Sequence, residues 1–230
     1  MNTPGKKFRK ALEDNKPLKV VGAINAYCAK MAEKAGHKAL YLSGAGVANA
    51  SFGLPDLAIT TLNDVAEDSR RITQATNLPL LIDIDTGFGG AFSISRTIKE
   101  MIAADVAAVH IEDQVTQKRC GHRPNKSLVD KVEMSDRIKA AVDGRTDDSF
   151  FIMARTDSYA SEGMEGAIDR CNEYIAAGAD GLFLEAVSSL EDYKQLKDAL
   201  QVPLLANITE FGKTPLFTAQ ELASVGVDIM

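Results

Sequence analysis

The chain has 230 residues, of which 45% are hydrophobic and 25% are charged, and its formal net charge is −6. This length and composition are those of a single globular domain over residues 1–230, and they exclude disordered and fibrous chains. The acidic balance and the lack of an apolar stretch of about 20 residues argue against nucleic acid and membrane as partners, and we expect a cytoplasmic protein because no apolar leader follows the basic N-terminus.

Short, almost continuously apolar runs recur along the chain, and stretches with helical spacing of apolar residues separate them. Such runs are typical of parallel strands that are covered on both faces. The helical spacing is clearest at 94–101, 134–141, 168–175 and 190–200. The predicted strands lie at 19–26, 39–43, 80–85, 107–113, 150–157, 181–185 and 203–209.

This alternation predicts an α/β fold, a (β/α)8 TIM barrel. Seven strand-helix units are present, and an eighth strand begins near Val227, just before the last residue. A barrel of this kind needs about 250 residues. We therefore expect the C-terminal strand and helices to be missing from this chain and the barrel to be unclosed. The alternative is an open doubly wound sheet, but no Gly-x-Gly-x-x-Gly turn follows the first strand.

The third predicted strand ends in two acidic residues, Asp83 and Asp85. Active sites of such barrels lie at the C-terminal ends of the strands, and residues two apart on a strand face the same side. A hard divalent cation such as Mg2+ would relieve the repulsion between two inward carboxylates, and Glu112 on the next strand would hold a metal-bound water. The competing interpretation pairs Asp83 with a lysine and lets Asp85 cap a turn.

The segment 118–126 is predicted to be a loop and to be mobile, because it lacks apolar residues that would anchor it in the core. Four basic residues surround Cys120 within it, and their positive potential stabilises a thiolate. A thiol of this kind exchanges protons near neutral pH. Two alternatives remain: a cysteine nucleophile with His122 as its base, and an exposed cysteine without a role.

The loop motif Lys118-Arg119-Cys120-Gly121-His122 resembles the signature of the isocitrate lyase and phosphoenolpyruvate mutase superfamily. Its extension through Lys126 is similar to the methylisocitrate lyase family within it. The resemblance covers essentially the whole chain. The matching stretches are YLSG at 41–44, GLPD at 53–56, DIDTGFG at 83–89, HIEDQ at 110–114, MARTD at 153–157 and NITEFG at 207–212.

The resemblance implies a Mg2+-dependent lyase that cleaves 2-methylisocitrate to pyruvate and succinate in the 2-methylcitrate cycle of propionate catabolism, and a homotetramer. It implies that Asp83, Asp85 and Glu112 hold the metal, directly or through water. Arg155 would pair with a substrate carboxylate, and Cys120, with His122 beside it, would protonate the succinate carbanion. Either Tyr41 or a metal-linked water would remove the hydroxyl proton. The implied substrate-binding residues are Ser43, Gly44, Ala45, Asp56, Cys120, Gly121, His122, Arg155, Glu185, Asn207, Ile208 and Thr209.

Other members of the superfamily are the competing interpretations. Isocitrate lyase is a much larger protein with a different sequence at 207–211, whereas dimethylmalate lyase and oxaloacetate hydrolase share the Cys-Gly-His loop. A phosphonomutase would use Asp56 near the transferred phosphoryl group and would not need Cys120. A catalytically silent barrel is disfavoured by the presence of Cys120, Asp83, Asp85 and Arg155 together.

Overall fold

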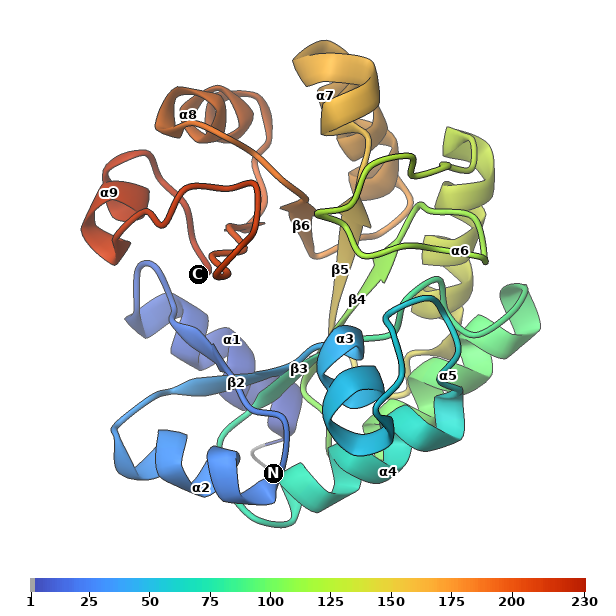
Figure 1. Cartoon of the computed structure of the whole chain (residues 1–230), viewed down its shortest axis with the longest axis vertical. Coiled ribbons are helices and arrows are strands. Elements are labelled where there is room, and N and C mark those ends of the chain that lie inside the picture. The colour runs from blue at the N-terminus through green and yellow to red at the C-terminus, as the bar shows by residue number, and fades with distance from the viewer. Residues whose placement is uncertain (1–2) are drawn as a thin grey trace.

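The computed structural model describes residues 3–230. Within that range, seven parallel strands form one sheet in the order β1-β2-β3-β4-β5-β6-β7, and the sheet curls around a central axis (Figure 1). The sequential order excludes the open doubly wound alternative, in which the strand order reverses within the sheet. The strands are β1 (Val20–Gly22), β2 (Ala39–Leu42), β3 (Leu80–Asp83), β4 (Ala108–Glu112), β5 (Phe151–Thr156), β6 (Gly181–Leu184) and β7 (Leu204–Leu205).

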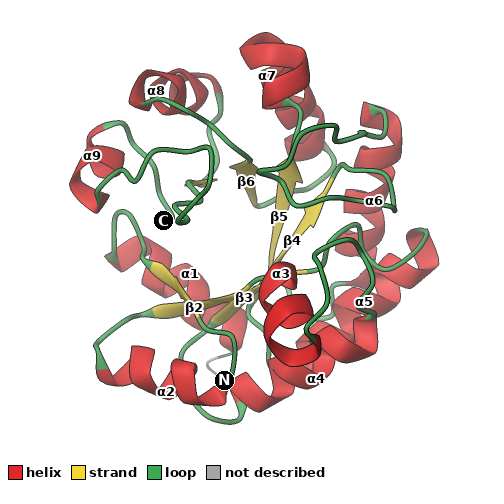
Figure 2. Cartoon of the chain, viewed as in Figure 1, coloured by secondary structure: helices red, strands yellow, loops and turns green. Residues whose placement is uncertain are grey.

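Helices surround the strands (Figure 2). Two of them begin in full capping boxes, at Thr61 and Thr218, where side chains satisfy the free backbone N–H groups. One long helix is kinked at Gly163, whose φ of 70° a residue with a side chain rarely adopts. The helical segments are α1 (Pro4–Asp14), α2 (Ala26–Lys34), α3 (Gly44–Gly46), the π-helical η1 (Val47–Ser51), α4 (Leu62–Thr73), α5 (Ala91–Ala103), α6 (Lys131–Gly144), α7 (Tyr159–Ala176), α8 (Leu190–Ala199) and α9 (Ala219–Ser224).

Side chains on each strand alternate between two hydrophobic cores. On β3, Leu80 and Ile82 belong to the large core between the sheet and the helices, whereas Leu81 belongs to the small core inside the barrel. This alternation is the period of two that a pleated strand imposes. It continues to the C-terminal end of β3, so that Asp83 is the next side chain to point inward. Asp83, the polar residue that ends β3, therefore faces the barrel interior.

The helix α1 fills the N-terminal end of the barrel. Phe8 and Leu12 on this helix pack with the small interior core, and the Phe8 ring lies 5.4 Å from that of Phe151. A Cβ at Gly5 would lie 2.5 Å from the carbonyl carbon of Ser149, so the close approach of α1 to the barrel requires glycine. Side chains of α1 thus fill the N-terminal end of the barrel interior, and a ligand can be bound only toward the C-terminal ends of the strands.

Three C-terminal residues occupy the place of the eighth strand. Ile229 bridges in parallel to Leu18 on one side and to Leu205 on the other. The Val20 N–H donates to the Met230 carbonyl, and the Ala206 N–H donates to the Ile229 carbonyl. The expectation of an unclosed barrel is therefore wrong: hydrogen bonds join the two edges of the sheet through this short segment.

The seven predicted strands are confirmed, although each is shorter than predicted. The first was expected to run to Ala26, but Asn25 caps α2 by accepting from the Cys28 N–H, and this ends the extended segment. The last was expected to run to Thr209, but β7 ends at Leu205. The four helices expected from apolar spacing correspond to α5, α6, α7 and α8.

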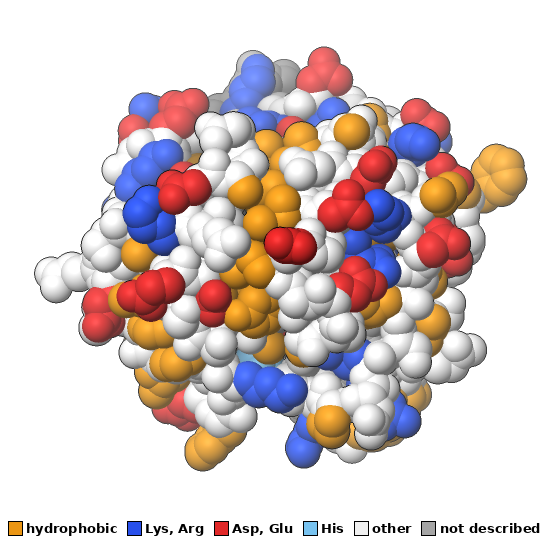
Figure 3. Space-filling model, turned by 90° about the horizontal axis from the view of Figure 1, so that it is seen from above, with side chains coloured by type: hydrophobic (Ala, Val, Ile, Leu, Met, Phe, Trp, Pro, Cys, Tyr) orange, Lys and Arg blue, Asp and Glu red, His pale blue; other side chains and the backbone are white. Residues whose placement is uncertain are grey.

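The outer surface mixes charges of both signs. On the face drawn in Figure 3, acidic and basic side chains are interspersed, and apolar side chains form a narrow strip between them. Among residues 3–230, no helix has the length and apolar character needed to cross a membrane.

Candidate active site

A cavity of about 510 Å³ lies at the C-terminal end of the strands. It continues sideways between β1 and β7, where Gly22, Met230 and Asn207 line it. Most of the residues expected to bind substrate or act in catalysis surround this cavity. They are Tyr41, Ser43, Ala45, Asp56, Cys120, Gly121, His122, Arg155, Glu185, Asn207, Ile208 and Thr209, together with the expected metal ligand Asp83.

Three predicted site residues, Gly44, Asp85 and Glu112, lie behind this lining. The Gly44 N–H donates to Asp83 Oδ2 at 3.2 Å, so this amide holds a carboxylate of the protein. Asp85 contributes to a second cavity of about 330 Å³ next to the first. Glu112 is fully buried beneath the cavity floor.

The carboxylates of Asp83 and Asp85 converge on Gly44. A Cβ at Gly44 would lie 3.2 Å from Asp83 Oδ2 and 3.0 Å from Asp85 Oδ1. Asp85 reaches this position although β3 has already ended, because its backbone adopts a φ of 47°. The Asp85 N–H also donates to Asp83 Oδ1 at 2.8 Å. Strain of this kind in a residue other than glycine is commonly kept at functional sites.

The donor set fits a hard divalent cation bound mainly through water and substrate. No three His, Cys, Asp or Glu side chains within residues 3–230 form a closed metal cage. Mg2+ needs no such cage, because one or two carboxylates usually suffice. Glu112 is buried, and neither of its carboxylate oxygens accepts a hydrogen bond from any residue in the range 3–230. Burial raises the pKa of Glu112, and burial together with Asp83 raises that of Asp85 to about 6. Both carboxylates would be stabilised as anions by an added cation.

Lys118 supplies positive charge to the same acids. Its ammonium lies 2.7 Å from Asp85 Oδ1 and also contacts Asp56, and only 3% of the residue is exposed. Burial lowers the pKa of Lys118, but the surrounding carboxylates raise it more, so the group stays charged. The sequence placed this lysine in the potential around Cys120, whereas in the structure it is paired with carboxylates. The lysine pairing weighed for Asp83 thus occurs at Asp85.

Arg155 is the centre of a buried ion cluster. Its guanidinium lies 3.3 Å from Glu112 Oε2 and 3.2 Å from Glu185 Oε2, and its Nε donates to Asp157 Oδ2 at 3.0 Å. The ring of Phe183 stacks beneath it, with the guanidinium carbon 5.0 Å from the ring centroid. The guanidinium is buried and its orientation is fixed by these contacts, so it is preorganised to bind a substrate carboxylate.

Tyr41 and His110 form a hydrogen-bonded pair inside the barrel. The Tyr41 hydroxyl lies 2.8 Å from His110 Nε2, and Asp83 Oδ1 lies 3.7 Å from His110 Nδ1. Burial lowers the pKa of His110 to about 4, so its imidazole is neutral near pH 7. Burial and Asp83 raise the pKa of Tyr41, which therefore stays a phenol. A neutral imidazole is able to accept a proton passed on through that phenol.

The segment 118–126 is a loop, as predicted, and brings Cys120 to the cavity. The backbone at Gly121 is wedged against the strands: a Cβ there would lie 2.5 Å from Glu185 Cγ and would clash with the Arg155 guanidinium. His122 Nε2 lies 3.3 Å from Glu185 Oε1. These contacts hold the two residues that follow Cys120 against Arg155 and Glu185, and all three loop residues line the same cavity.

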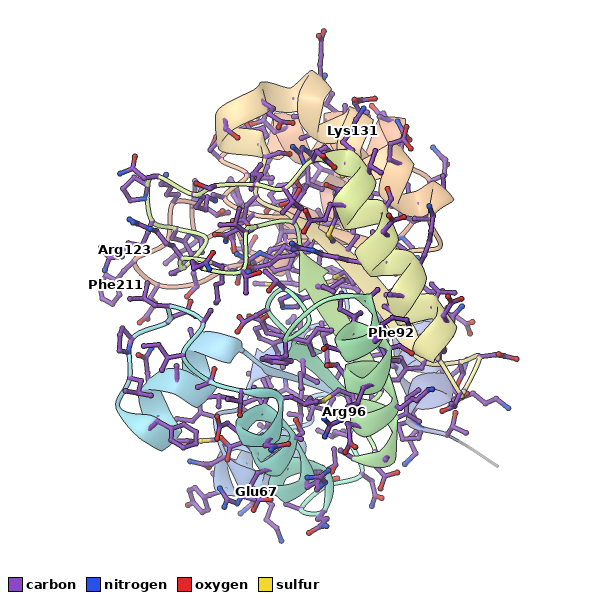
Figure 4. All side chains as sticks on the ribbon, turned by 90° about the vertical axis from the view of Figure 1, so that its right-hand side faces the viewer. Glu67, Phe92, Arg96, Arg123, Lys131 and Phe211 are labelled. Atoms are coloured by element: carbon purple, nitrogen blue, oxygen red, sulfur yellow. The ribbon has the colours of Figure 1, made fainter. Side chains whose placement is uncertain are left out.

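A second loop, 207–214, packs against the cysteine loop. The Lys213 N–H donates to His122 Nδ1 at 3.1 Å, and Asn207 Nδ2 lies 3.5 Å from His122 Nε2. Arg123 and Phe211 project on the same side of the molecule from these two loops (Figure 4). His122 therefore joins the two loops that border the cavity.

From the sequence, no binding, catalytic or metal-ligating role was assigned to His110, Lys118, Lys126 or Asp157. His110 sits on β4 between two apolar residues, and that inward position was a usable signal. Lys118 and Lys126 pair with carboxylates distant in the sequence, such as Lys126 with Asp157, and local spacing gives no sign of these pairs.

Comparisons with known proteins agree with this arrangement. The phosphoenolpyruvate phosphomutase family model matches residues 8–230. The chain is 62% identical over 226 residues to the 2-methylisocitrate lyase of Shewanella oneidensis, covering 98% of this chain and 77% of that protein.

Solved structures of proteins from the same superfamily superpose closely on this chain. The crystal structure of 2,3-dimethylmalate lyase superposes with a TM-score of 0.94 at 39% identity, over 100% of this chain and 78% of that one. Phosphonopyruvate hydrolase in complex with oxalate and Mg2+ superposes with a TM-score of 0.84 at 28% identity, over 99% and 79%. The resemblance drawn from the motifs is confirmed, and the chain belongs to the phosphoenolpyruvate phosphomutase family, as an enzyme of its carbon-carbon lyase group.

Proposed function

We propose that the chain cleaves 2-methylisocitrate into pyruvate and succinate. The observation that carries the proposal is the convergence of Cys120, Arg155 and the Asp83 carboxylate on one cavity at the end of the barrel. The identity of 62% to a 2-methylisocitrate lyase supports this substrate over those of other family members. We also propose that the fold is a (β/α)8 barrel, that the enzyme is a homotetramer and that it serves propionate breakdown through the 2-methylcitrate cycle.

Mg2+ is the proposed cofactor. Asp83 and Asp85 would hold it, directly or through water, and Glu112 would orient a bound water. A relative that superposes on this chain was solved with oxalate and Mg2+, which supports the same use of the site. The bound ion would supply Lewis acidity to the hydroxyl and carboxylate of the half that becomes pyruvate.

The remaining anchors of the substrate are cationic or polar side chains. Arg155 pairs with the carboxylate of the pyruvate half, and its partners Glu112 and Asp157 fix its orientation. Ser43 and Ala45 line the same part of the cavity, at the start of the short helix α3. Glu185, which also pairs with Arg155, and His122 lie with the loop residues proposed to contact the succinate half. These are Asp56, Gly121, Asn207, Ile208 and Thr209.

The reaction needs one proton removed and one delivered. The substrate hydroxyl gives its proton to the Tyr41–His110 pair, with the phenol at the cavity wall and the neutral imidazole behind it. The carbon-carbon bond then breaks, the oxygen becomes the ketone of pyruvate and the electron pair stays on the succinate carbon. The Cys120 thiol donates its proton to that carbon, and the thiolate is left beside Gly121 and His122.

The test is product release by purified protein supplied with Mg2+. Pyruvate should form from 2-methylisocitrate much faster than glyoxylate forms from isocitrate, and EDTA should stop turnover. A preference for isocitrate, or turnover that resists EDTA, would refute the assignment. Cys120→Ser should nearly abolish turnover while substrate still binds, and full turnover by this variant would remove the thiol from the reaction.

A further inference from the structure

Asp157 is a buried carboxylate behind the site, and it does not line the cavity. Its side chain is fully buried, and Oδ2 accepts from Arg155 Nε at 3.0 Å. Its own backbone N–H donates to Asp113 Oδ1 at 3.0 Å. Burial raises the pKa of Asp157, but Arg155 and Lys126 lower it more, so the net pKa lies below its usual range. Asp157 is therefore an anion fixed on the end of β5.

Lys126 connects this anion to the cysteine loop. Its ammonium donates to Asp157 Oδ1 at 2.6 Å and to the Gly121 carbonyl at 2.7 Å, and only 8% of the side chain is exposed. One cation thus joins the end of a strand to the residue next to Cys120. Charge-assisted hydrogen bonds of this kind are about twice as strong as neutral ones, and both are protected from water here.

The same carboxylate therefore holds two parts of the site. Its Oδ2 fixes Arg155, while its Oδ1 fixes Lys126 and, through it, the Gly121 carbonyl. Gly121 in turn lies so close to Arg155 that only glycine fits between them. We propose that Lys126 and Asp157 are positioning residues that set the place of Cys120 relative to Arg155. Neither residue touches substrate in this assignment, and each acts through the groups it holds.

The first test measures the thiol without any substrate. The variant Lys126→Met removes the ammonium, and the rate of alkylation of Cys120 by iodoacetamide is followed by peptide mass spectrometry. Cys28, half-buried on α2, is the internal reference on the same chain. Loss of the two hydrogen bonds should free the loop, and the rate at Cys120 relative to Cys28 should change by roughly tenfold.

Two further variants sharpen this experiment. Lys131→Met is the matched control, because Lys131 is a partly exposed lysine paired with Asp169 on the surface. It should leave the Cys120 rate unchanged. Asp157→Asn weakens the same link from its other end and should shift the rate in the same direction as Lys126→Met. A Cys120 rate in Lys126→Met equal to that of the control would overturn the proposal. Loss of the fold in this variant would also overturn it, since a positioning link in a loop does not carry the stability of the barrel.

The second readout rests on the proposed function. For cleavage of 2-methylisocitrate, Lys126→Met should lower kcat by roughly ten to a hundredfold while KM changes less, because the displaced group acts after binding. A rise in KM alone would contradict a role in placing the thiol. If the chain used another substrate, turnover would fail in the wild type as well, whereas the alkylation result would stand. Failure of the proposed function can therefore be distinguished from failure of the positioning role of Lys126.

Discussion

Lys118 Nζ lies 2.7 Å from Asp85 Oδ1, so a loop lysine neutralises one of the two carboxylates proposed to hold the metal. Asp56 contacts the same ammonium from the opposite loop. A bound divalent ion and this ammonium would repel each other at such short range. Binding of the ion and the position of Lys118 are therefore expected to depend on each other.

We predict that Lys118→Met binds Mg2+ at least roughly tenfold more tightly than the wild type, while its turnover falls. The metal-free variant should be less stable, because Asp56 and Asp85 lose their shared cation. The measurement is the melting temperature with and without Mg2+, where tighter binding gives a larger rise. Lys131→Met, on the surface, serves as the control. A smaller rise in Lys118→Met than in the wild type would contradict the prediction.

Tyr41→Phe should lower kcat by roughly 10²- to 10⁴-fold, the usual contribution of general acid-base catalysis, with little effect on substrate binding. The change deletes the hydroxyl that lies 2.8 Å from His110 Nε2 and keeps the ring. The matched control is Tyr27→Phe, since Tyr27 is 73% exposed on α2. Steady-state rates of pyruvate release report the difference. Equal kcat in the two variants would leave a metal-linked water as the base.

Gly121→Ala should nearly abolish turnover while the melting temperature changes little. The new methyl group would lie 2.5 Å from Glu185 Cγ and against the Arg155 guanidinium, so the cysteine loop has to move away. Gly90→Ala is the control, because a Cβ at Gly90 meets nothing within 4 Å. Comparison of kcat with melting temperature separates displacement of the loop from unfolding. Full activity of Gly121→Ala would show that the loop tolerates another position.

Asp228 makes the stability of the barrel dependent on pH. Its carboxylate accepts from the Leu204 N–H at 3.0 Å and from Lys197 at 2.7 Å. Burial raises the pKa of Asp228, but these two donors lower it more, so the folded-state pKa lies below that of the unfolded chain. Its contribution is therefore complete above about pH 4 and is lost as the pH falls through the folded-state pKa.

Asp228→Asn should accordingly lose less stability than the wild type on acidification below about pH 4, and should be about 1 to 3 kcal/mol less stable at pH 7. Urea unfolding across this pH range measures both effects. Asp198→Asn is the control, since Asp198 forms an exposed pair with Lys194. Parallel pH curves for Asp228→Asn and the wild type would show that this carboxylate does not link folding to pH.

The inward position of Asp83 was predictable because strand alternation is a local property that continues through apolar neighbours. The cavity residues Cys120 and Arg155 were predictable because the motifs around them are specific. The position of Asp85 was only partly predictable, since it depends on a φ of 47° beyond the end of β3. A period of two does not apply there.

Other features depend on contacts between distant residues. Phe8 lies in a segment whose basic residues suggested only a charged N-terminus, and its burial follows from packing against Phe151. The sequence indicated the start of an eighth strand near Val227, but it gave no sign that Ile229 bridges both edges of the sheet. The link between Lys126 and Asp157 spans 31 residues of sequence and has no local signature.

Phe8 on α1 fills the N-terminal end of the barrel and does not line the cavity, which extends from the opposite end to the gap between β1 and β7. The proposed reaction turns one molecule into two, and neither product can leave past Phe8. Both products should therefore depart on the side of the barrel away from α1, past the loops that border the cavity.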